Sequence, residues 1–524
     1  MRAIERLARN SLRAADAAAT RFYGWRYNPL HQTGTIAVAL LIVLIVTGLY
    51  LLVFYRVSEP WESVQRLAAD PWLGRWIRSL HRFASDAMVV AVVVHVLRMF
   101  AQERSWGPRA LAWVSGVVLF LFVFVSGWTG FVMVWDTFGA RLAIVGARLF
   151  DALPILSEPV QRVFSGERPI PSAFFFVNLF LHIAIPLSVG AGLWIHVSRL
   201  ARPTLLPPKP LGVAVISGLL VLSVVFPAPL PPEADPFVIP EGVPVDWFFA
   251  FWLPWVEALP ISIAWAGAVA TLALAAAVPL FTRRAREGAH APSVVDPRLC
   301  TGCNQCPQDC PWHAITMVPR DDDRPTLVAL VDPALCVSCG ICAGSCAPMG
   351  VGPPGRTGRD QLQQVRGFDF AIPAIRRRAP VVAITCAQLP ATHVHALEEA
   401  GAPIHMVSCS GNLHTSAVEQ FLRDGAAGVI VFSCAPRDCR GREGPKWLLQ
   451  RMYHDREAEL QPRVDRRRVR LATAAPGNLA GTLAEFRTFA DSVEALGIQD
   501  LQPDSEDLVC EPQPVVASKR RAWR

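Results

Sequence analysis

The chain has 524 residues and a formal net charge of +7, and 52% of its residues are hydrophobic, with a mean hydropathy of +0.33. This apolar content argues against a wholly soluble protein, and the length predicts several domains. The sequence has no basic patch interleaved with aromatic residues, so the positive charge does not indicate a nucleic-acid partner.

Nearly all of the long charge-free runs lie before Phe281, so residues 1–282 are expected to form a membrane half and the remainder a soluble half. The first thirty residues are rich in arginine and lack the short apolar core of a cleavable signal peptide. A bilayer core of about 30 Å requires about 20 apolar residues in a helix. On this criterion we expect an all-α bundle of about six transmembrane helices, the fifth the shortest, at 35–54, 80–100, 111–135, 173–200, 211–226 and 261–281.

The orientation of these spans can be predicted from the basic residues around them. Arginines and lysines precede the first span, join the second to the third and the fourth to the fifth, and follow the sixth. The loop between the fifth and sixth spans has none. The positive-inside rule therefore predicts that both chain ends lie in the cytoplasm of a prokaryote, with the chain spanning the inner membrane several times in contact with lipid. Residues 141–164 and 246–259 are expected to lie at the membrane interface.

Two of the predicted spans carry a matched pair of histidines. His81 and His95 lie on the second span and His182 and His196 on the fourth, and each pair is fourteen residues apart. Fourteen residues make nearly four helical turns, about 21 Å, so each pair faces one side of its helix. Both helices run inward, so we expect His81 opposite His182 near the outer surface and His95 opposite His196 near the inner one. A lone histidine could simply pack against a neighbouring helix, but two identical spacings favour ligation of two haems b.

Glycines repeat the fourteen-residue spacing on the first and third spans. A residue without a Cβ lets a flat macrocycle approach the backbone, although small residues also serve helix packing alone. The pattern predicts that four glycines border the haems: Gly34, Gly48, Gly116 and Gly130.

On these residues the region from about 25 to 282 resembles the cytochrome b of quinol-oxidising bc and b6f complexes. Arg78, three residues before His81, and Arg98, three residues after His95, match family arginines that pair with haem propionates. Pro186 also fits the family pattern. The resemblance implies two haems b, quinone or quinol as substrate, and a bundle that can form a homodimer.

Two further segments resemble the outer quinol site of that family. Residues 130–135 look like its Gly-Tyr-Val-Leu-Pro-Trp segment, with Val134 at the position where proline is usual. Val245-Asp246-Trp247-Phe248 stands where the family has Pro-Glu-Trp-Tyr, whose glutamate is associated with proton removal from quinol. The resemblance implies that Asp246 accepts a proton from quinol; the alternative is an ordinary acidic residue at the membrane interface.

All thirteen cysteines lie at or after Cys300, and eight of them stand in tight Cys-x-x-Cys runs, which in a reducing compartment indicates metal ligation. Residues 298–352, after an expected linker at 283–297, contain two cysteine runs with the spacing of bacterial two-cluster ferredoxins. Paired Cys-x-x-Cys motifs of zinc ribbons fit this order poorly. We expect an α+β ferredoxin-like module with one [4Fe–4S] cluster on Cys300, Cys303, Cys306 and Cys346 and a second on Cys336, Cys339, Cys342 and Cys310.

Residues 380–500, after a second expected linker at 353–379, predict a small α/β domain. We expect strands at 381–385, 404–408 and 429–433, and helices at 414–424 and 447–456. Cysteines directly follow the three strands, where ligands gather in open parallel sheets. The pattern predicts a four-thiolate site for a [2Fe–2S] cluster, with a zinc site or buried packing thiols as alternatives, at Cys386, Cys409, Cys434 and Cys439.

This last region resembles the small iron–sulfur subunit of methyl-viologen-reducing hydrogenases. The resemblance is carried by Cys409-Ser410-Gly411 and by residues 434–444, which contain Cys434 and Cys439. That subunit passes electrons to heterodisulfide reductase-type flavoproteins, which implies a cytoplasmic partner of the heterodisulfide reductase, hydrogenase or dehydrogenase kind. Residues 501–524 are expected to form an irregular tail in which Cys510 is a free thiol.

The order of these parts suggests an electron path from the outer haem through the inner haem and the two [4Fe–4S] clusters to a [2Fe–2S] centre that faces the partner. We predict a quinone-linked oxidoreductase subunit that exchanges electrons between the quinone pool and a cytoplasmic oxidoreductase. The sequence lacks a phosphate-binding loop and a flavin fingerprint, so dehydrogenase chemistry is expected on another subunit. Two alternatives stay open: a bc-type quinol oxidase core with a Rieske-type partner, and a non-catalytic membrane anchor or docking scaffold.

Overall fold

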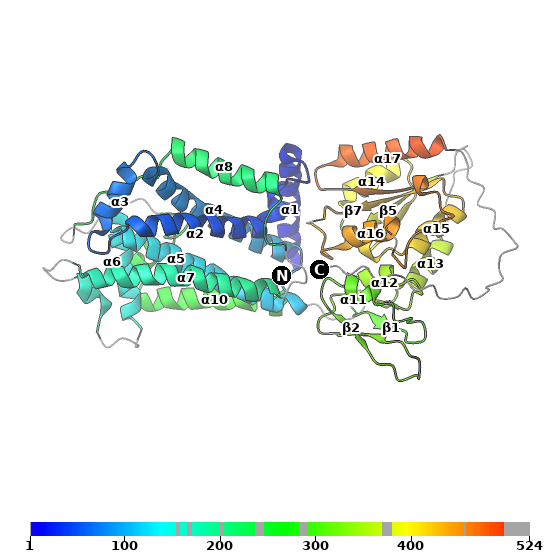
Figure 1. Ribbon diagram of the computed structural model, residues 1–524, viewed down its shortest axis with the longest axis horizontal. Helices are drawn as coiled ribbons and strands as arrows, with labels where there is room; N and C mark the ends of the chain where they lie inside the picture. Colours follow the sequence, from blue (N-terminus) through cyan, green and yellow to red (C-terminus); the bar gives the residue numbers. More distant parts are fainter. Residues whose placement is uncertain are drawn as a thin grey trace.

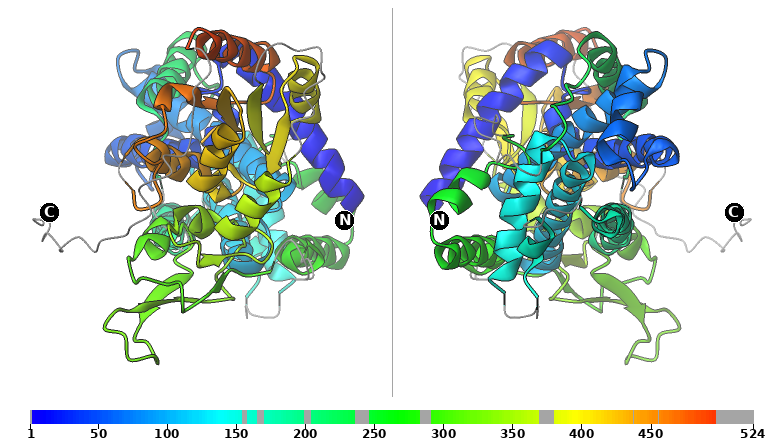
Figure 2. Two further views of the ribbon diagram at one scale, coloured as in Figure 1. Left: turned by 90° about the vertical axis from the view of Figure 1, so that its right-hand side faces the viewer. Right: turned by 90° about the vertical axis from the view of Figure 1, so that its left-hand side faces the viewer.

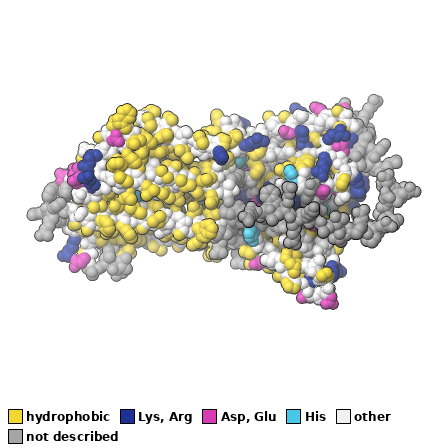
Figure 3. All heavy atoms as spheres, in the orientation of Figure 1, with side chains coloured by type: hydrophobic (Ala, Val, Ile, Leu, Met, Phe, Trp, Pro, Cys, Tyr) yellow, Lys and Arg dark blue, Asp and Glu magenta, His cyan; other side chains and the backbone are white. Residues whose placement is uncertain are grey.

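The computed structural model describes residues 2–153, 158–164, 170–198, 204–235, 246–282, 291–368, 380–436, 438–454 and 456–496. A bundle of long helices, formed by residues before 283, adjoins the rest of the chain at one end (Figure 1). Hydrophobic side chains cover the visible face of the bundle, and charged side chains gather at its free end and over the other half (Figure 3). This distribution agrees with a membrane half followed by a soluble half.

Five helices among the described residues are long and apolar enough to cross a membrane. They are α2 (Thr33–Phe54), α4 (Gly74–Ala101), α5 (Ala110–Val134), α7 (Ser172–Ser198) and α10 (Ile261–Thr282). The expected fifth span corresponds to α8 (Lys209–Val225), whose 17 residues make it shorter than the others. It packs along α4, with Leu211 buried in the shared core. The positions of the apolar helices were therefore predicted to within a few residues at most ends.

Shorter helices close the two ends of the bundle. On one side lie α3 (Pro60–Ala69), α6 (Thr137–Asp151), η3 (Val160–Phe164) and α9 (Leu253–Ala258). The helices α6 and α9 fall in the two segments that were expected at the membrane interface. Near the soluble half lie η1 (Pro29–Gln32) and η2 (Gly107–Arg109).

The helix α1 (Arg2–Tyr23) crosses the end of the bundle at the junction of the two halves (Figures 1 and 2). Its polar residues Glu5, Asp16 and Thr20 are buried, whereas Ile4 and Leu7 are exposed. Hydropathy alone does not predict this helix, because its apolar residues occupy one face only. An amphipathic helix of this kind is suited to the membrane surface.

The ferredoxin-like part contains two small antiparallel sheets. In one, β1 (Val294–Val295) pairs with β4 (Val351–Gly352), and in the other β2 (Ile315–Val318) pairs with β3 (Val328–Val331). Each cysteine run also contains one turn of helix, α11 (Gln305–Asp309) or α12 (Ile341–Ser345). Because β1 belongs to this part, the expected linker at 283–297 is shorter than predicted; its residues 283–290 lie outside the described residues.

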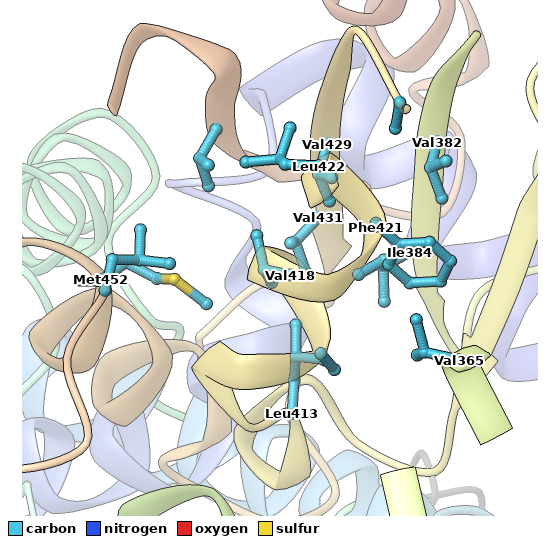
Figure 4. Packing of buried hydrophobic residues seen from close by; sticks show 14 of the residues in the cluster. Val365, Val382, Ile384, Leu413, Val418, Phe421, Leu422, Val429, Val431 and Met452 are labelled. Atoms are coloured by element: carbon cyan, nitrogen blue, oxygen red, sulfur yellow. The ribbon is translucent and has the colours of Figure 1, made fainter. Parts of the chain in front are cut away.

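The C-terminal part has a four-stranded parallel sheet with helices on both faces. The strand order is β6-β5-β7-β8, with bounds β5 (Val381–Cys386), β6 (Ile404–Val407), β7 (Gly428–Ser433) and β8 (Val469–Thr473). Figure 4 shows one core, which contains Phe421 and Met452 together with Val382, Ile384 and Val431 of the sheet. The helices are α13 (Gly358–Arg366), α15 (Thr415–Arg423) and α16 (Gly444–Tyr453) on this face and α14 (Ala391–Glu399) and α17 (Leu479–Glu494) on the other, with the short turns η5 (Ser410–Asn412) and η6 (Arg466–Arg468) in the loops.

The second expected linker, 353–379, is wrong in its first half. Residues Thr357 and Asp360 form a capping box that starts α13, and Val365 is buried against the sheet core. The sequence of α13 is strongly polar, so only a narrow apolar stripe marks it as part of the domain. Residues 369–379 and the expected tail with Cys510 lie outside the described residues.

Candidate functional sites

The structure brings together the histidines of both predicted pairs between α4 and α7. The ring centroids of His81 and His182 are 6.3 Å apart, with the rings tilted by 60°. A metal ion held between two imidazole nitrogens at about 2 Å each requires ring centres roughly 6 Å apart. His95 and His196 lie close to each other further along the same two helices. The spacing of the outer pair therefore fits one iron between two imidazoles.

Each of the four imidazoles has its Nδ1 atom held by the neighbouring helix. The contacts are Thr47 Oγ1 with His81 (2.9 Å), Thr33 Oγ1 with His95 (3.5 Å), the Ser126 carbonyl oxygen with His182 (2.8 Å) and Ser115 Oγ with His196 (2.9 Å). A ligating histidine usually hydrogen-bonds through the nitrogen that does not bind the metal, and this fixes the ring orientation. The Nε2 atoms are therefore the ones left for a metal, which fits bis-histidine haem ligation.

The four predicted glycines lie directly against these imidazoles. A Cβ added to Gly130 would lie 2.8 Å from Cε1 of His182. The corresponding distances to the nearest imidazole atom are 3.0 Å at Gly34 and 3.3 Å at both Gly48 and Gly116. Glycine at these positions thus gives room to the imidazole of the neighbouring helix. Contact between the glycines and a macrocycle stays a prediction.

The two arginines expected near haem propionates have protein partners in the structure. Arg78 donates to the carbonyl oxygens of Ala228 (3.0 Å) and Pro229 (2.9 Å). Arg98 is buried and donates to the carboxylates of Asp16 and Asp438. Pairing of either guanidinium with a propionate stays a prediction.

The carboxylates of Asp16 and Asp438 lie beside His31 in an arrangement that could hold a metal ion. Nε2 of His31 is 3.5 Å from Oδ1 of Asp16. However, the guanidinium of Arg98 already forms ion pairs with both carboxylates. This cluster is therefore an ion-pair network at the junction of the two halves, which the sequence did not reveal because its members are far apart in the chain.

Asp246 forms an ion pair with Arg82, whose guanidinium also contacts Asp86. The same guanidinium lies over the ring of Phe131, 4.6 Å from its centroid. Asp246 also accepts hydrogen bonds from the backbone N–H groups of Phe248 (3.0 Å) and Phe249 (2.6 Å). Arg82 thus joins the two segments that resemble an outer quinol site, although Val245 lies outside the described residues. Proton transfer to Asp246 stays a prediction.

A second acidic residue at this end of the bundle, Asp136, was missed by sequence reasoning. It is 5% exposed and accepts a hydrogen bond from the Gly139 N–H at 2.7 Å, which starts α6. Burial raises the pKa of Asp136 to about 6. The available sequence signal was that Asp136 directly follows Trp135, the last residue of the segment that resembles the outer quinol site.

The eight ferredoxin-type cysteines fall into the two predicted groups. A cavity is lined by Cys300, Cys303, Cys306 and Cys346 together with Pro348 and Gly350. Cys339 lies close to Cys342, Cys310 and Cys336. This grouping places the fourth cysteine of each run with the first three of the other run, as two-cluster ferredoxins require.

The surroundings of these thiols fit a bound cation. Burial raises the pKa values of the Cys306, Cys339 and Cys342 thiols, so their thiolates need a nearby positive charge. Backbone N–H groups point at sulfur atoms: Gly350 at Cys346 (3.2 Å) and Ala314 at Cys310 (3.4 Å). Such N–H···S contacts tune the potentials of iron–sulfur clusters.

Four buried cysteines converge at the carboxyl ends of the parallel strands. Cys386 ends β5, Cys409 follows β6, and Cys434 and Cys439 follow β7; together they form one cluster. The sulfur atoms of Cys386 and Cys434 are 3.7 Å apart. Four thiols in this arrangement fit a [2Fe–2S] cluster or a zinc ion equally well, so the choice of metal stays a prediction.

A glycine next to this cluster leaves space for the sulfur atoms. A Cβ added to Gly444 would lie 2.7 Å from Sγ of Cys409 and 3.2 Å from Sγ of Cys439. Gly444 begins α16, so the backbone at that helix end approaches the thiols closely. A side chain at this position would push the ligands out of place.

Three successive parts of the chain match family models. Residues 25–202 match "Cytochrome b/b6/petB", residues 299–350 match the "4Fe-4S dicluster domain", and residues 382–497 match the "Methyl-viologen-reducing hydrogenase, delta subunit". These matches confirm the three resemblances that the histidine and cysteine patterns indicated.

The cytochrome b part has a curated relative in Geobacillus thermodenitrificans. Over 165 residues this chain is 26% identical to the menaquinol:cytochrome c reductase cytochrome b subunit of that organism. The aligned region covers 30% of this chain and 74% of the relative. A solved structure described as "Hyperthermophilic respiratory Complex III" covers 48% of this chain and 75% of its own, with 14% sequence identity and a TM-score of 0.38. The family matches and the apolar helices indicate a multi-pass membrane protein that takes part in electron transfer within a redox complex.

Proposed function

We propose that this chain transfers electrons between the quinone pool and a cytoplasmic oxidoreductase of the heterodisulfide reductase, hydrogenase or dehydrogenase kind. In this proposal it lies in a prokaryotic inner membrane with both chain ends in the cytoplasm. It holds one haem b between His81 and His182 and another between His95 and His196. The soluble half holds two [4Fe–4S] clusters and, at the four buried cysteines of the α/β domain, a [2Fe–2S] cluster.

The observation that carries the proposal is the common surrounding of the four intramembrane histidines. Each has its Nδ1 atom engaged by a hydroxyl or carbonyl oxygen and its ring against a glycine of the neighbouring helix. A histidine that only fills space between helices does not require both features. Four repeats of the same arrangement at matched spacing support haem ligation.

The haems and clusters, when bound, supply reversible one-electron chemistry. The protein holds them through imidazole nitrogens and thiolates and tunes them with hydrogen bonds and burial. On α4, Ala84 and Met88, which lie between the two histidine positions, are buried in an apolar core.

The quinone side of the proposal is supported by the relative, whose printed name is that of a menaquinol:cytochrome c reductase subunit. The cytoplasmic side is supported by the hydrogenase delta match over residues 382–497. A second candidate function is quinol oxidation in a bc-type core with a Rieske-type partner. The ion pair that brings Asp246 beside Phe131, through Arg82, favours that candidate.

The proposal is tested by adding a menaquinol analogue to the purified full-length protein under anaerobic conditions and recording its haem absorbance. We expect reduced b-type bands to appear within the turnover time of the enzyme. Oxidised haems that stay oxidised with quinol present, yet are reduced by dithionite, would instead favour the anchor or scaffold.

A further inference from the structure

The loop that carries Cys439 is bonded to the membrane half. Arg104, which lies between α4 and α5, donates to the carbonyl oxygen of Cys439. Arg109 donates to the carbonyl oxygen of Arg440 at 3.1 Å. One backbone segment of the four-cysteine site therefore lies against the loop that follows α4.

An ion pair adds a second connection at the same place. Arg98, three residues after His95 on α4, donates to the carboxylate of Asp438, and Gln102 donates to the same oxygen. Arg98 is 2% exposed and is also bonded to Asp16 of α1. Removing one partner of a buried charge pair is strongly destabilising, so this junction holds one position. From His95 the helix α4 continues for six residues to Ala101, a rise of about 9 Å, and is followed by the loop that contacts the Cys439 segment. The inner histidine and the four-cysteine site are thus connected by this short piece of helix and one loop.

The other side of the four-cysteine site faces the ferredoxin-like part. The Sγ atoms of Cys409 and Cys439 and the Cβ atom of Cys339 all lie within 4 Å of the point that a Cβ on Gly441 would occupy. Cys339 belongs to the second cysteine run. The four-cysteine site and the second cysteine run therefore lie close together, on either side of Gly441.

Buried contacts hold the second run in that position. Arg451 of α16 donates to the carbonyl oxygens of Ile341 (3.1 Å) in α12 and Gly411 (2.6 Å) in η5. Asn412 donates to the carbonyl oxygen of Gly340 at 3.1 Å. Gly340 and Ile341 directly follow Cys339, so the distance between the two cysteine sites is set by hydrogen bonds on both sides.

The first cysteine group lies closer to solvent than the four-cysteine site. Its cavity is lined by Thr301 and Asn304, both exposed, beside the half-buried Cys300 and Cys303. By contrast, Cys386 and Cys439 are each 1% exposed. The four-cysteine site is thus enclosed between the membrane half and the second run.

We propose that the four-cysteine site is an internal electron-transfer site, which connects the inner histidine pair to the cluster site of Cys310, Cys336, Cys339 and Cys342. The site of Cys300, Cys303, Cys306 and Cys346 then exchanges electrons with the soluble partner. This inference rests on the proposed function. At each step one site loses one electron and its neighbour gains it, with quinol or quinone at one end and a soluble redox protein at the other.

This spatial order differs from the order along the chain, which suggested that the α/β domain faces the partner. The difference arises because the ferredoxin-like part, although it comes first in sequence, packs beside the α/β domain and leaves the Cys439 loop at the membrane junction (Figure 1). The order along the chain gives only the covalent sequence of the parts, whereas electron transfer depends on the distance between sites in space.

The test is the electron spin relaxation of the four-cysteine centre, measured by EPR on the full-length protein poised at set potentials with mediators. A paramagnetic neighbour at short distance should speed its relaxation. We expect faster relaxation when the [4Fe–4S] clusters are reduced and paramagnetic. This effect should be lost in Cys339→Ser and retained in the matched variant Cys303→Ser, because each is the second cysteine of its run.

Two results would overturn the inference. One is a relaxation rate of the four-cysteine centre that changes more in Cys303→Ser than in Cys339→Ser, or that does not change in the unmodified protein when the [4Fe–4S] clusters are reduced. The other is metal analysis that finds zinc at the four-cysteine site, since zinc carries no electron. The unmodified protein gives an answer even if a variant fails to fold. Because mediators set the potentials, the result does not depend on quinol, so a failure of the proposed function is seen separately as haems that quinol cannot reduce.

Discussion

The histidine sites of the membrane half and the four-cysteine site of the α/β domain were accessible to sequence reasoning to different degrees. A transmembrane helix converts a spacing of fourteen residues into one face and a fixed distance, so the histidine pairs could be placed before any fold was known. The four cysteines come from three strands and a loop, and they meet only because the sheet is parallel. Regular secondary structure therefore carries spatial information in sequence, while the four-cysteine site could be predicted only on the added assumption that its strands form a parallel sheet.

The largest effect is expected from removing one histidine. His182→Ala should remove the outer haem and about half of the b-type absorbance per chain, because a bis-histidine site loses one of its two protein ligands. The matched control is His395→Ala on α14, whose side chain is 73% exposed. Haem content per polypeptide is the measurement, and full absorbance in His182→Ala would contradict the assignment.

A smaller but selective effect is expected at Asp246. Asp246→Asn retains an oxygen for the N–H groups of Phe248 and Phe249 but removes the charge that pairs with Arg82. If Asp246 accepts a proton from quinol, quinol-driven haem reduction should slow at least about tenfold, within the range seen for acid–base groups. The haem spectrum should stay unchanged. A rate equal to that of the unmodified protein would assign Asp246 to the interface only.

At the four-cysteine site we expect a shift of potential and not a loss of the centre. Arg104→Leu removes a half-buried guanidinium and the hydrogen bond to the carbonyl oxygen of Cys439, both of which favour the reduced, more negative state. The midpoint potential should fall by about 60 mV, a tenfold change for one electron. Arg298→Ala, with a side chain that is 87% exposed, serves as the control. An EPR-monitored titration in which both variants have the same potential would contradict a junction at Cys439.

The smallest effect concerns stability near the outer end of the bundle. Burial raises the pKa of Asp136 in the folded protein to about 6, above its value in the unfolded chain. The contribution of the protonated carboxyl group to folding stability is therefore fully present below about pH 4 and is lost as the pH rises through 6. Asp136→Asn keeps the cap on Gly139 and should remove this loss, with a gain of up to about 3 kcal/mol at pH 7. Thermal unfolding in detergent at pH 4 and pH 7 measures it. If the stability of the variant depends on pH in the same way as that of the unmodified protein, burial does not destabilise the charged form of Asp136.

The fold was predictable where a single period dominates. The apolar helices α2, α4, α5, α7 and α10 and the strands β5, β6 and β7 lie close to their expected positions. The strand β8 was missed because it follows Arg466-Arg467-Arg468, and α13 because its sequence is mainly polar. In each case burial of a few side chains in the tertiary core outweighs local composition.

Within the sites, the ligand types were predictable and their surroundings were not. Thr47 and Ser115 gave no sequence signal, because a hydroxyl in a span usually bonds to its own helix. The network of Arg98, Asp16 and Asp438 unites residues that are 82 and 340 positions apart. Such long-range contacts depend on how the two halves pack, which no local pattern encodes.

The central claim is that imidazoles of α4 and α7 hold two haems, and the most direct measurement is the haem content of the purified chain by pyridine haemochrome assay. We expect two haems b per polypeptide in the unmodified protein and none when His81, His95, His182 and His196 are all replaced by alanine. A colourless unmodified protein from haem-replete cells, or an undiminished haem content in the four-histidine variant, would contradict it.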